Sequence, residues 1–201
     1  MELSDTYFSI ACETQSTLRE KASKFLAFAS PVTNEEEVKS YLERLKKEHF
    51  NANHHCYAYR LGHPKAGVYR INDDGEPSGT AGRPIYGQLL SRNLSDLIVV
   101  VIRYFGGTKL GVPGLIHAYK SATSDSLDQN RIITKVITTQ ICVTFPVLQM
   151  NDVMKILKQE EADILSQEYE INYTILFSIR KSKSDLIKSR LSSITNISIY
   201  E

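Results

Sequence analysis

The chain has 201 residues and a formal net charge of +1, and its composition is 42% hydrophobic and 23% charged. These proportions are typical of an ordinary folded protein, and they exclude an intrinsically disordered chain. The small net charge gives no reason to expect strong non-specific attraction to nucleic acid from the protein as a whole. At this length the chain can form one domain or two small ones, and we expect two.

The aliphatic segments are too short to cross a membrane. The longest uninterrupted run extends from Leu97 to Ile102, whereas a helix that spans a bilayer needs about 20 apolar residues. The first residues, MELSDTYFSI, lack the basic and apolar regions of a signal peptide. We therefore expect a cytoplasmic protein with no membrane partner.

The first third of the chain predicts two strands followed by a helix. Short strands are expected around Tyr7–Ile10 and Phe25–Ala29. Asn34 and Glu37 have the spacing of a capping box, so a helix is expected to begin there. HHCYAYRL and GVYRIND then indicate the two strands of a hairpin.

The middle of the chain predicts a buried strand between two helices. One helix is expected to end near Asn93, the apolar run LIVVVIRY indicates the strand, and a second helix is expected from about Gly114 to Leu127.

In the last third, VITTQICVTF, ADILSQ, INYTILFSI and the closing ISIY read as strands, with helical apolar spacing from Met150 and again near Ser184. This βαββαβ order is the ferredoxin-like arrangement. The sequence thus predicts an α+β protein with an N-terminal domain at 1–133 and a ferredoxin-like domain at 134–201. The second domain has no histidine and no glycine and offers no candidate site.

Two glycine-rich loops each lead towards a helix: DDGEPSGTAGRP begins at Asp73, and RYFGGTKLGVPGL begins at Arg103. Helix N-termini expose unpaired N–H groups and a partial positive charge, so they attract anions. We therefore predict that the two loops converge on one anion. The candidate anion- or RNA-binding residues are Arg83, Arg103, Lys109, Lys120, Ser78, Thr80, Thr108, Gly106 and Gly107.

The charges along this part of the chain are uneven. Asp96 is the one acidic residue between Arg83 and Lys120, so the central stretch is basic. Asp73, Asp74 and Glu76 lie immediately upstream, where they could pair with the arginines or bind a cation. Asp74 and Glu76 are also the candidates for an acid–base pair, although adjacent loop carboxylates are usually solvated. The sequence leaves these alternatives open.

Metal and nucleophile chemistry are not favoured by the other residues. His54 and Cys56 point to one side of the predicted strand and His55 to the other, so neighbours cannot chelate one ion together. The remaining cysteines, Cys12 and Cys142, form no C-x-x-C pair, and neither a P-loop nor a G-x-S-x-G motif is present. We expect a non-enzymatic protein without metal or cofactor.

Four segments carry a family resemblance: KASKFLAFASPV, HHCYAYRLG, DDGEPSGTAGRPI and VVVIRYFGGTKLGVPGLIHAYK. Together they resemble the YigZ/IMPACT family over most of the first domain. The resemblance implies a first domain similar to the second domain of a small-subunit ribosomal protein, and a second domain similar to one of elongation factor G. The chain has Pro113-Gly114 where many members have Gly-Gly, and His117 where an arginine is common, which removes a permanent cation.

The resemblance implies a role in translation, because eukaryotic relatives regulate translation, while the bacterial members have no assigned activity. With the basic central stretch, this leads us to expect an RNA- or ribosome-associated binding protein. One alternative is that the converging loops bind or transform a small phosphorylated or carboxylated ligand. Another is a protein-partner module in which the glycine loops are only structural.

Overall fold

The computed structural model describes residues 5–64 and 67–200, which divide into two units. Tyr7–Lys135 form the N-terminal unit, whereas Asp5 and Thr6 join the residues from Val136 onward in the C-terminal unit. By this division the N-terminal unit ends at Lys135, and the described residues before Tyr7 belong to the other unit. The chain therefore passes between the units twice.

The N-terminal unit is built on a five-stranded sheet in the order β2-β3-β6-β4-β5, in which all neighbours are antiparallel. Strand β1 pairs with β7 in a separate two-stranded sheet. The elements are β1 (Thr6–Ile10), β2 (Thr14–Glu20), β3 (Ser23–Pro31), α1 (Glu35–Glu48), β4 (His54–Leu61), β5 (Val68–Asn72), α2 (Gly82–Ser91), β6 (Leu97–Tyr104), α3 (Gly111–Asp128) and β7 (Ile132–Val136).

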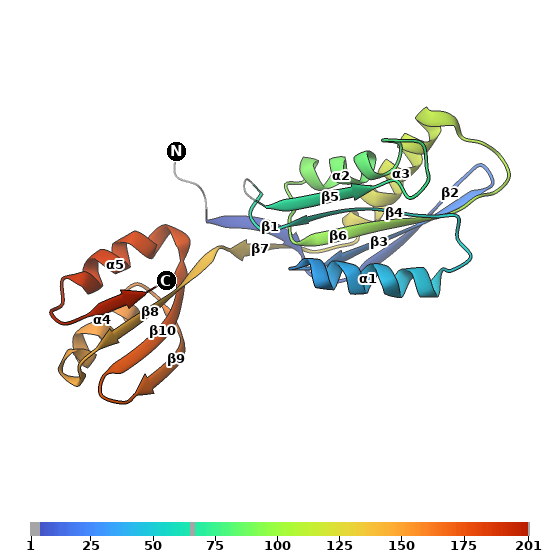
Figure 1. Ribbon diagram of the computed structural model, residues 1–201. Coiled ribbons are helices and arrows are strands. Elements are labelled where there is room, and N and C mark those ends of the chain that lie inside the picture. The colour runs from blue at the N-terminus through green and yellow to red at the C-terminus, as the bar shows by residue number, and fades with distance from the viewer. Residues whose placement is uncertain (1–4, 65–66, 201) are drawn as a thin grey trace. The chain divides into compact units, whose positions relative to one another are not determined.

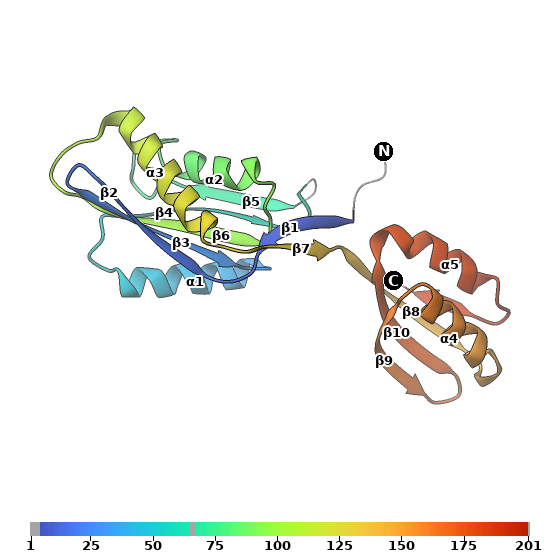
Figure 2. The same cartoon turned by 180° about the vertical axis from the view of Figure 1, so that it is seen from behind.

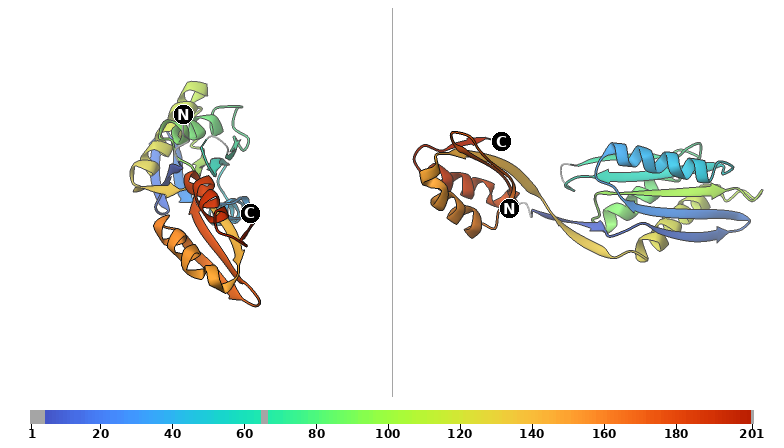
Figure 3. Two further views of the ribbon diagram at one scale, coloured as in Figure 1. Left: turned by 90° about the vertical axis from the view of Figure 1, so that its left-hand side faces the viewer. Right: turned by 90° about the horizontal axis from the view of Figure 1, so that it is seen from below.

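Helices cover both faces of the five-stranded sheet, with α1 on one face and α2 and α3 on the other (Figures 1 and 3). Each face has its own apolar core, and the central strand β6 supplies residues to both. The apolar residues of β6 alternate between the two cores, so the whole run from Leu97 to Ile102 is buried. This explains why LIVVVI is continuously apolar instead of alternating with polar residues.

The start of α1 resembles the predicted capping box, although the reciprocal hydrogen bond goes to the residue before the N-cap Asn34. The Oδ1 of Asn34 accepts the Glu37 N–H at 2.9 Å, and the Glu37 carboxylate accepts the Thr33 N–H at 2.7 Å. Glutamates occupy the first turn, and Lys46 and Lys47 occupy the last, which suits the helix dipole. The local sequence alone therefore sets this boundary.

Strand β2 was not predicted, because its inward face carries Thr14 and Ser16 and only one apolar residue that packs on the core, Leu18. Ser16 is buried, and its hydroxyl donates to the Ala122 carbonyl of α3 at 3.0 Å. Thr14 makes a similar hydrogen bond to the Ser126 carbonyl at 2.8 Å. Polar residues that bond to a helix backbone give no hydrophobic alternation, so the usual strand pattern is missing.

The C-terminal unit is ferredoxin-like, as predicted. Its antiparallel sheet has the order β11-β8-β10-β9, and both helices lie on one face of it (Figure 2). The packed apolar residues of this unit come from the helices and from alternate positions of the strands. The elements are β8 (Thr138–Phe145), α4 (Met150–Gln159), β9 (Asp163–Tyr169), β10 (Tyr173–Arg180), α5 (Ser184–Ser192) and β11 (Ser198–Tyr200).

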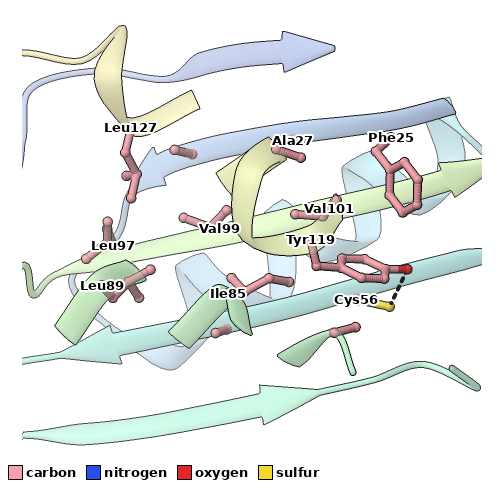
Figure 4. Packing of buried hydrophobic residues seen from close by; sticks show 14 of the residues in the cluster. Phe25, Ala27, Cys56, Ile85, Leu89, Leu97, Val99, Val101, Tyr119 and Leu127 are labelled. Carbon is pink, nitrogen blue, oxygen red and sulfur yellow. Dashed lines mark hydrogen bonds between the residues drawn. The ribbon is translucent and has the colours of Figure 1, made fainter. Parts of the chain in front are cut away.

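The core beneath α2 and α3 supports the loops that carry the candidate site. Ile85 and Leu89 of α2 pack with Val99 and Val101 of β6 and with Tyr119 of α3 (Figure 4). Tyr119 is fully buried, and its ring meets Phe25 edge to face with 5.2 Å between centroids. No helix within residues 5–64 and 67–200 combines the length and the apolar character needed to cross a membrane.

Candidate functional site

A cavity of about 430 Å³ lies in the N-terminal unit where the two glycine loops meet. Glu76, Arg103 and Leu115 are its buried lining residues, while Phe105 and Lys109 are exposed and belong to its rim. The lining residues are Asn53, His54, Glu76, Pro77, Arg103, Phe105, Lys109, Leu110, Gly111, Val112 and Leu115.

A buried ion pair joins the two loops. Arg103, near the end of β6, places its Nη1 2.6 Å from the Glu76 Oε1, with side chains 6% and 3% exposed respectively. The Tyr119 hydroxyl donates to the same carboxylate oxygen at 2.8 Å. Of the alternatives left open for the acidic residues, Glu76 thus pairs with an arginine. A buried pair of this kind depends strongly on each partner, because either charge alone would be uncompensated.

The Arg103 guanidinium is held between two aromatic rings. Its Cζ lies 5.4 Å from the centroid of Phe25 and 5.3 Å from that of Phe105, which are cation–π distances. Its Nη2 donates to the Ser23 hydroxyl at 3.3 Å. The buried Nε has no hydrogen-bond partner among the described residues. The cavity is therefore lined by a cation that several contacts hold in place and that has one buried donor without a partner among the described residues.

The N–H groups of the first loop already hold an anion, which is Asp73 of the same chain. Its carboxylate accepts from the N–H groups of Gly79 at 2.9 Å, Ala81 at 3.0 Å and Gly82 at 2.8 Å. Burial alone would raise the pKa of the Asp73 carboxyl, but these hydrogen bonds and the charge of Arg83 hold it below its ordinary value. The start of α2 is thus satisfied internally.

The start of α3 differs from the start of α2. No side chain among the described residues caps it, and Leu110, Gly111 and Val112 of this first turn line the cavity next to Lys109. Uncapped N–H groups carry partial positive charge. The combination of helix start and lysine makes this side of the cavity electropositive.

Of the predicted anion-binding residues, Arg103 and Lys109 line the cavity together. Arg83, Lys120, Ser78 and Thr108 are exposed and lie outside its lining. Thr80 is buried, and its hydroxyl donates to the Pro77 carbonyl at 2.7 Å, which closes a local turn. Their roles in binding remain predictions.

Gly106 and Gly107 of the second loop are each required to be glycine, but for different structural reasons. A Cβ on Gly106 would lie 1.9 Å from the Ala22 carbonyl oxygen, so the close approach of the β2–β3 turn requires glycine. Gly107 has open space around it but a φ of +84°, which side chains rarely adopt. Neither glycine lines the cavity.

The two acid–base candidates are placed differently. The carboxylate of Asp74 accepts the His55 N–H at 2.6 Å and is not part of the cavity lining, whereas Glu76 is. His54 lines the cavity with its Nε2 3.9 Å from the Glu76 Oε1. Its Nδ1 lies 2.8 Å from the Asp74 carbonyl oxygen, which can only accept, so Nδ1 carries the hydrogen.

Sequence reasoning did not identify Asn53, His54 and Phe105 as companions of Arg103. His54 lies directly opposite Arg103 in the pairing of β4 with β6, and the Asn53 Oδ1 accepts the Phe105 N–H at 2.8 Å. These neighbours follow from the register in which β4 pairs with β6, and the sequence of one strand alone does not determine how it pairs with another. Within residues 5–64 and 67–200, no group of three or more His, Cys, Asp or Glu side chains could hold a metal ion.

We expect Cys56 to be chemically inert in the folded protein. Its thiol donates to the Asp73 carbonyl at 3.0 Å, and burial, which deprives a charged thiolate of solvation, raises the pKa of the thiol well above its ordinary value. Native protein treated with a thiol reagent at pH 8 should be modified at the exposed Cys12, and at Cys56 only after unfolding. Modification of Cys56 at the rate of Cys12, measured by mass spectrometry, would contradict this expectation.

The fold and the cavity define a two-unit α+β protein, with a ferredoxin-like second unit and a first unit whose cavity is lined by two cations and one carboxylate. Residues 21–127 match the family described as the Impact N-terminal domain. The chain belongs to this family, which confirms the family predicted from the sequence.

Several relatives extend this match. The IMPACT family member YvyE of Bacillus subtilis is 29% identical over 95% of this chain and 88% of its own. A protein IMPACT homolog of Schizosaccharomyces pombe is 35% identical over 52% of this chain and 38% of its own. A crystal structure described as that of a hypothetical protein covers 98% of this chain and 97% of its own, with 26% identity and a TM-score of 0.75.

Proposed function

We propose that this chain is a non-enzymatic RNA-binding protein with a role linked to translation, and that its cavity receives an RNA phosphate. One observation carries the proposal: the uncapped start of α3 and Lys109 line the same cavity as Arg103, whose buried Nε has no hydrogen-bond partner among the described residues. Helix N–H groups, an exposed ammonium and a guanidinium are the groups that bind phosphate in proteins.

The contrast between the two helix starts supports a ligand at α3. The start of α2 is occupied by the carboxylate of Asp73, so it has no need of an external anion. The start of α3 has the same kind of N–H groups without such a carboxylate, and it has a lysine beside it. An external anion is the group that would complete it.

The link to translation rests on family membership and on the implied likeness of the first unit to a ribosomal protein domain. Membership is shared with eukaryotic IMPACT proteins. A protein of this kind would meet RNA phosphates on ribosomal or messenger RNA.

The size of the cavity favours one alternative, the binding of a small phosphorylated or carboxylated ligand. Its volume of about 430 Å³ falls within the range of about 300–1,000 Å³ that small-molecule pockets occupy. The same cations would then hold the ligand, so the two functions differ in the ligand and not in the site.

The salt dependence of RNA binding tests the proposal. Affinity for a single-stranded oligoribonucleotide should fall as salt rises, because bound phosphates release counterions. Lys109→Ala should weaken binding by a similar factor for all sequences and reduce the salt slope by about one. Fluorescence anisotropy at several salt concentrations measures both quantities.

Lys155→Ala provides the matched control, since it removes the same charge from an exposed position on α4 in the other unit. It should leave both affinity and slope at wild-type values. Equal effects of the two substitutions, or no RNA binding at low salt, would refute the proposal.

A further inference from the structure

The geometry points to a single unpaired nucleotide as the occupant of the cavity, with its phosphate at Lys109 and the start of α3 and its base against Phe105. This inference rests on the proposed function and specifies the chemistry of the ligand at the same site. It depends on Phe105 and on three groups of lining residues: a cationic side with Lys109 and the start of α3, an apolar wall of Phe105, Leu110, Val112 and Leu115, and a polar floor of Asn53, His54 and Glu76.

Phe105 is an exposed aromatic ring held in a fixed place. The residue is 44% exposed, although the Arg103 guanidinium carbon lies over the ring, 5.3 Å from its centroid. Its backbone N–H is bound by the Asn53 side chain at 2.8 Å. An exposed aromatic ring fixed from one side is a stacking platform for an unpaired base, and stacking of this kind tolerates any base.

The apolar wall continues from Phe105 along the first turn of α3. Leu110, Val112 and Leu115 line the cavity with it, and Val112 is 51% exposed. A purely ionic phosphate site would have no use for this apolar surface. A base is flat and largely apolar on its faces, so it matches this wall while its phosphate reaches the adjacent cations.

The polar floor suits the sugar. Glu76, His54 and Asn53 line the cavity, and one oxygen of the Glu76 carboxylate already accepts hydrogen bonds from Arg103 and Tyr119. A carboxylate is a common acceptor for ribose hydroxyls.

The size of the cavity excludes a duplex. A volume of about 430 Å³ has the scale of one small ligand, and paired bases within a helix cannot reach an aromatic wall. The occupant is therefore a free nucleotide or the unpaired nucleotide of an RNA end, loop or bulge. These sources share the chemistry that the cavity would recognise.

The experiment compares Phe105→Leu with the wild type for four probes: a single-stranded oligoribonucleotide, an RNA duplex of equal length, adenosine 5′-monophosphate and inorganic phosphate. Leucine keeps an apolar side chain and removes the stacking face. It should weaken the oligoribonucleotide and the mononucleotide by about tenfold and leave inorganic phosphate unchanged. Phe50→Leu is the matched control, because Phe50 is 83% exposed and lies outside the cavity lining.

The outcomes separate this inference from the proposed function. Oligoribonucleotide binding that requires Lys109 but is unaffected by Phe105→Leu would overturn the inference and leave RNA binding standing. Mononucleotide binding that requires Phe105, with no oligoribonucleotide binding, would confirm the nucleotide and overturn RNA as its source. Duplex bound as tightly as single strand, with the same dependence on Phe105, would also overturn the inference.

Discussion

Asp73→Ala is expected to lower the free energy of unfolding of the N-terminal unit by about 2–3 kcal/mol, because it removes a helix cap and leaves N–H groups without an acceptor. Three of these groups, on Gly79, Ala81 and Gly82, now donate to the carboxylate, and Ala81 and Gly82 are buried. Urea unfolding measures the loss, and amide hydrogen exchange at the three residues should show where it occurs.

The stabilisation that Asp73 provides should decrease as the pH falls. Because the folded state holds the pKa of this carboxyl below its ordinary value, the stabilisation is fully present above the unfolded-state pKa of about 3.9. It is lost as the pH falls through the folded-state pKa. The difference in the free energy of unfolding between the wild type and an Asp73→Asn variant should therefore become smaller as the solution is made acidic.

Asp125→Ala is the matched control for Asp73→Ala. Asp125 is exposed on α3, and its carboxylate makes no hydrogen bond or ion pair among the described residues. Its replacement should change the free energy of unfolding by less than about 0.5 kcal/mol. If Asp73→Ala were no more costly than this control, the internal cap would have no energetic role.

Glu76→Ala is expected to be more severe, with a loss of about 3–5 kcal/mol in the free energy of unfolding. The substitution leaves the Arg103 guanidinium buried without its carboxylate, and it removes the acceptor of the Tyr119 hydroxyl. Thermal unfolding followed by circular dichroism should show a large drop in the transition temperature of the N-terminal unit.

A double variant distinguishes the loss of the pair from the loss of packing. Glu76→Ala combined with Arg103→Met removes both charges and keeps an apolar side chain between Phe25 and Phe105. It should be more stable than Glu76→Ala alone, since no uncompensated charge remains. A double variant less stable than the single one would show that the ion pair is not the dominant interaction.

Sequence reasoning succeeded where one segment contains the whole signal. The capping box at Asn34, the buried strand β6 and the βαββαβ order of the C-terminal unit all depend on local spacing. Strand β2 was missed because its inward Ser16 is satisfied by the backbone of α3, a contact between distant parts of the chain.

The candidate site was predictable only in part for the same reason. Helix starts and cations are visible in the sequence, and these led to Arg103 and Lys109. The sequence does not show that one loop has an internal anion and the other has none, because this depends on which donor each carboxylate reaches in the folded chain. Asp73 caps its own loop and Glu76 crosses to the other, although three positions separate them in the chain.

The double passage of the chain between the units makes the N-terminal unit an insertion within the other one. Its two ends are adjacent, since Ala11 donates to the Arg131 carbonyl at one end of the β1–β7 pair and Ile137 donates to Asp5 at the other. A unit with neighbouring ends can be transplanted into a host loop or joined end to end into a ring. The cavity could therefore be carried as a portable module, independent of the ferredoxin-like unit.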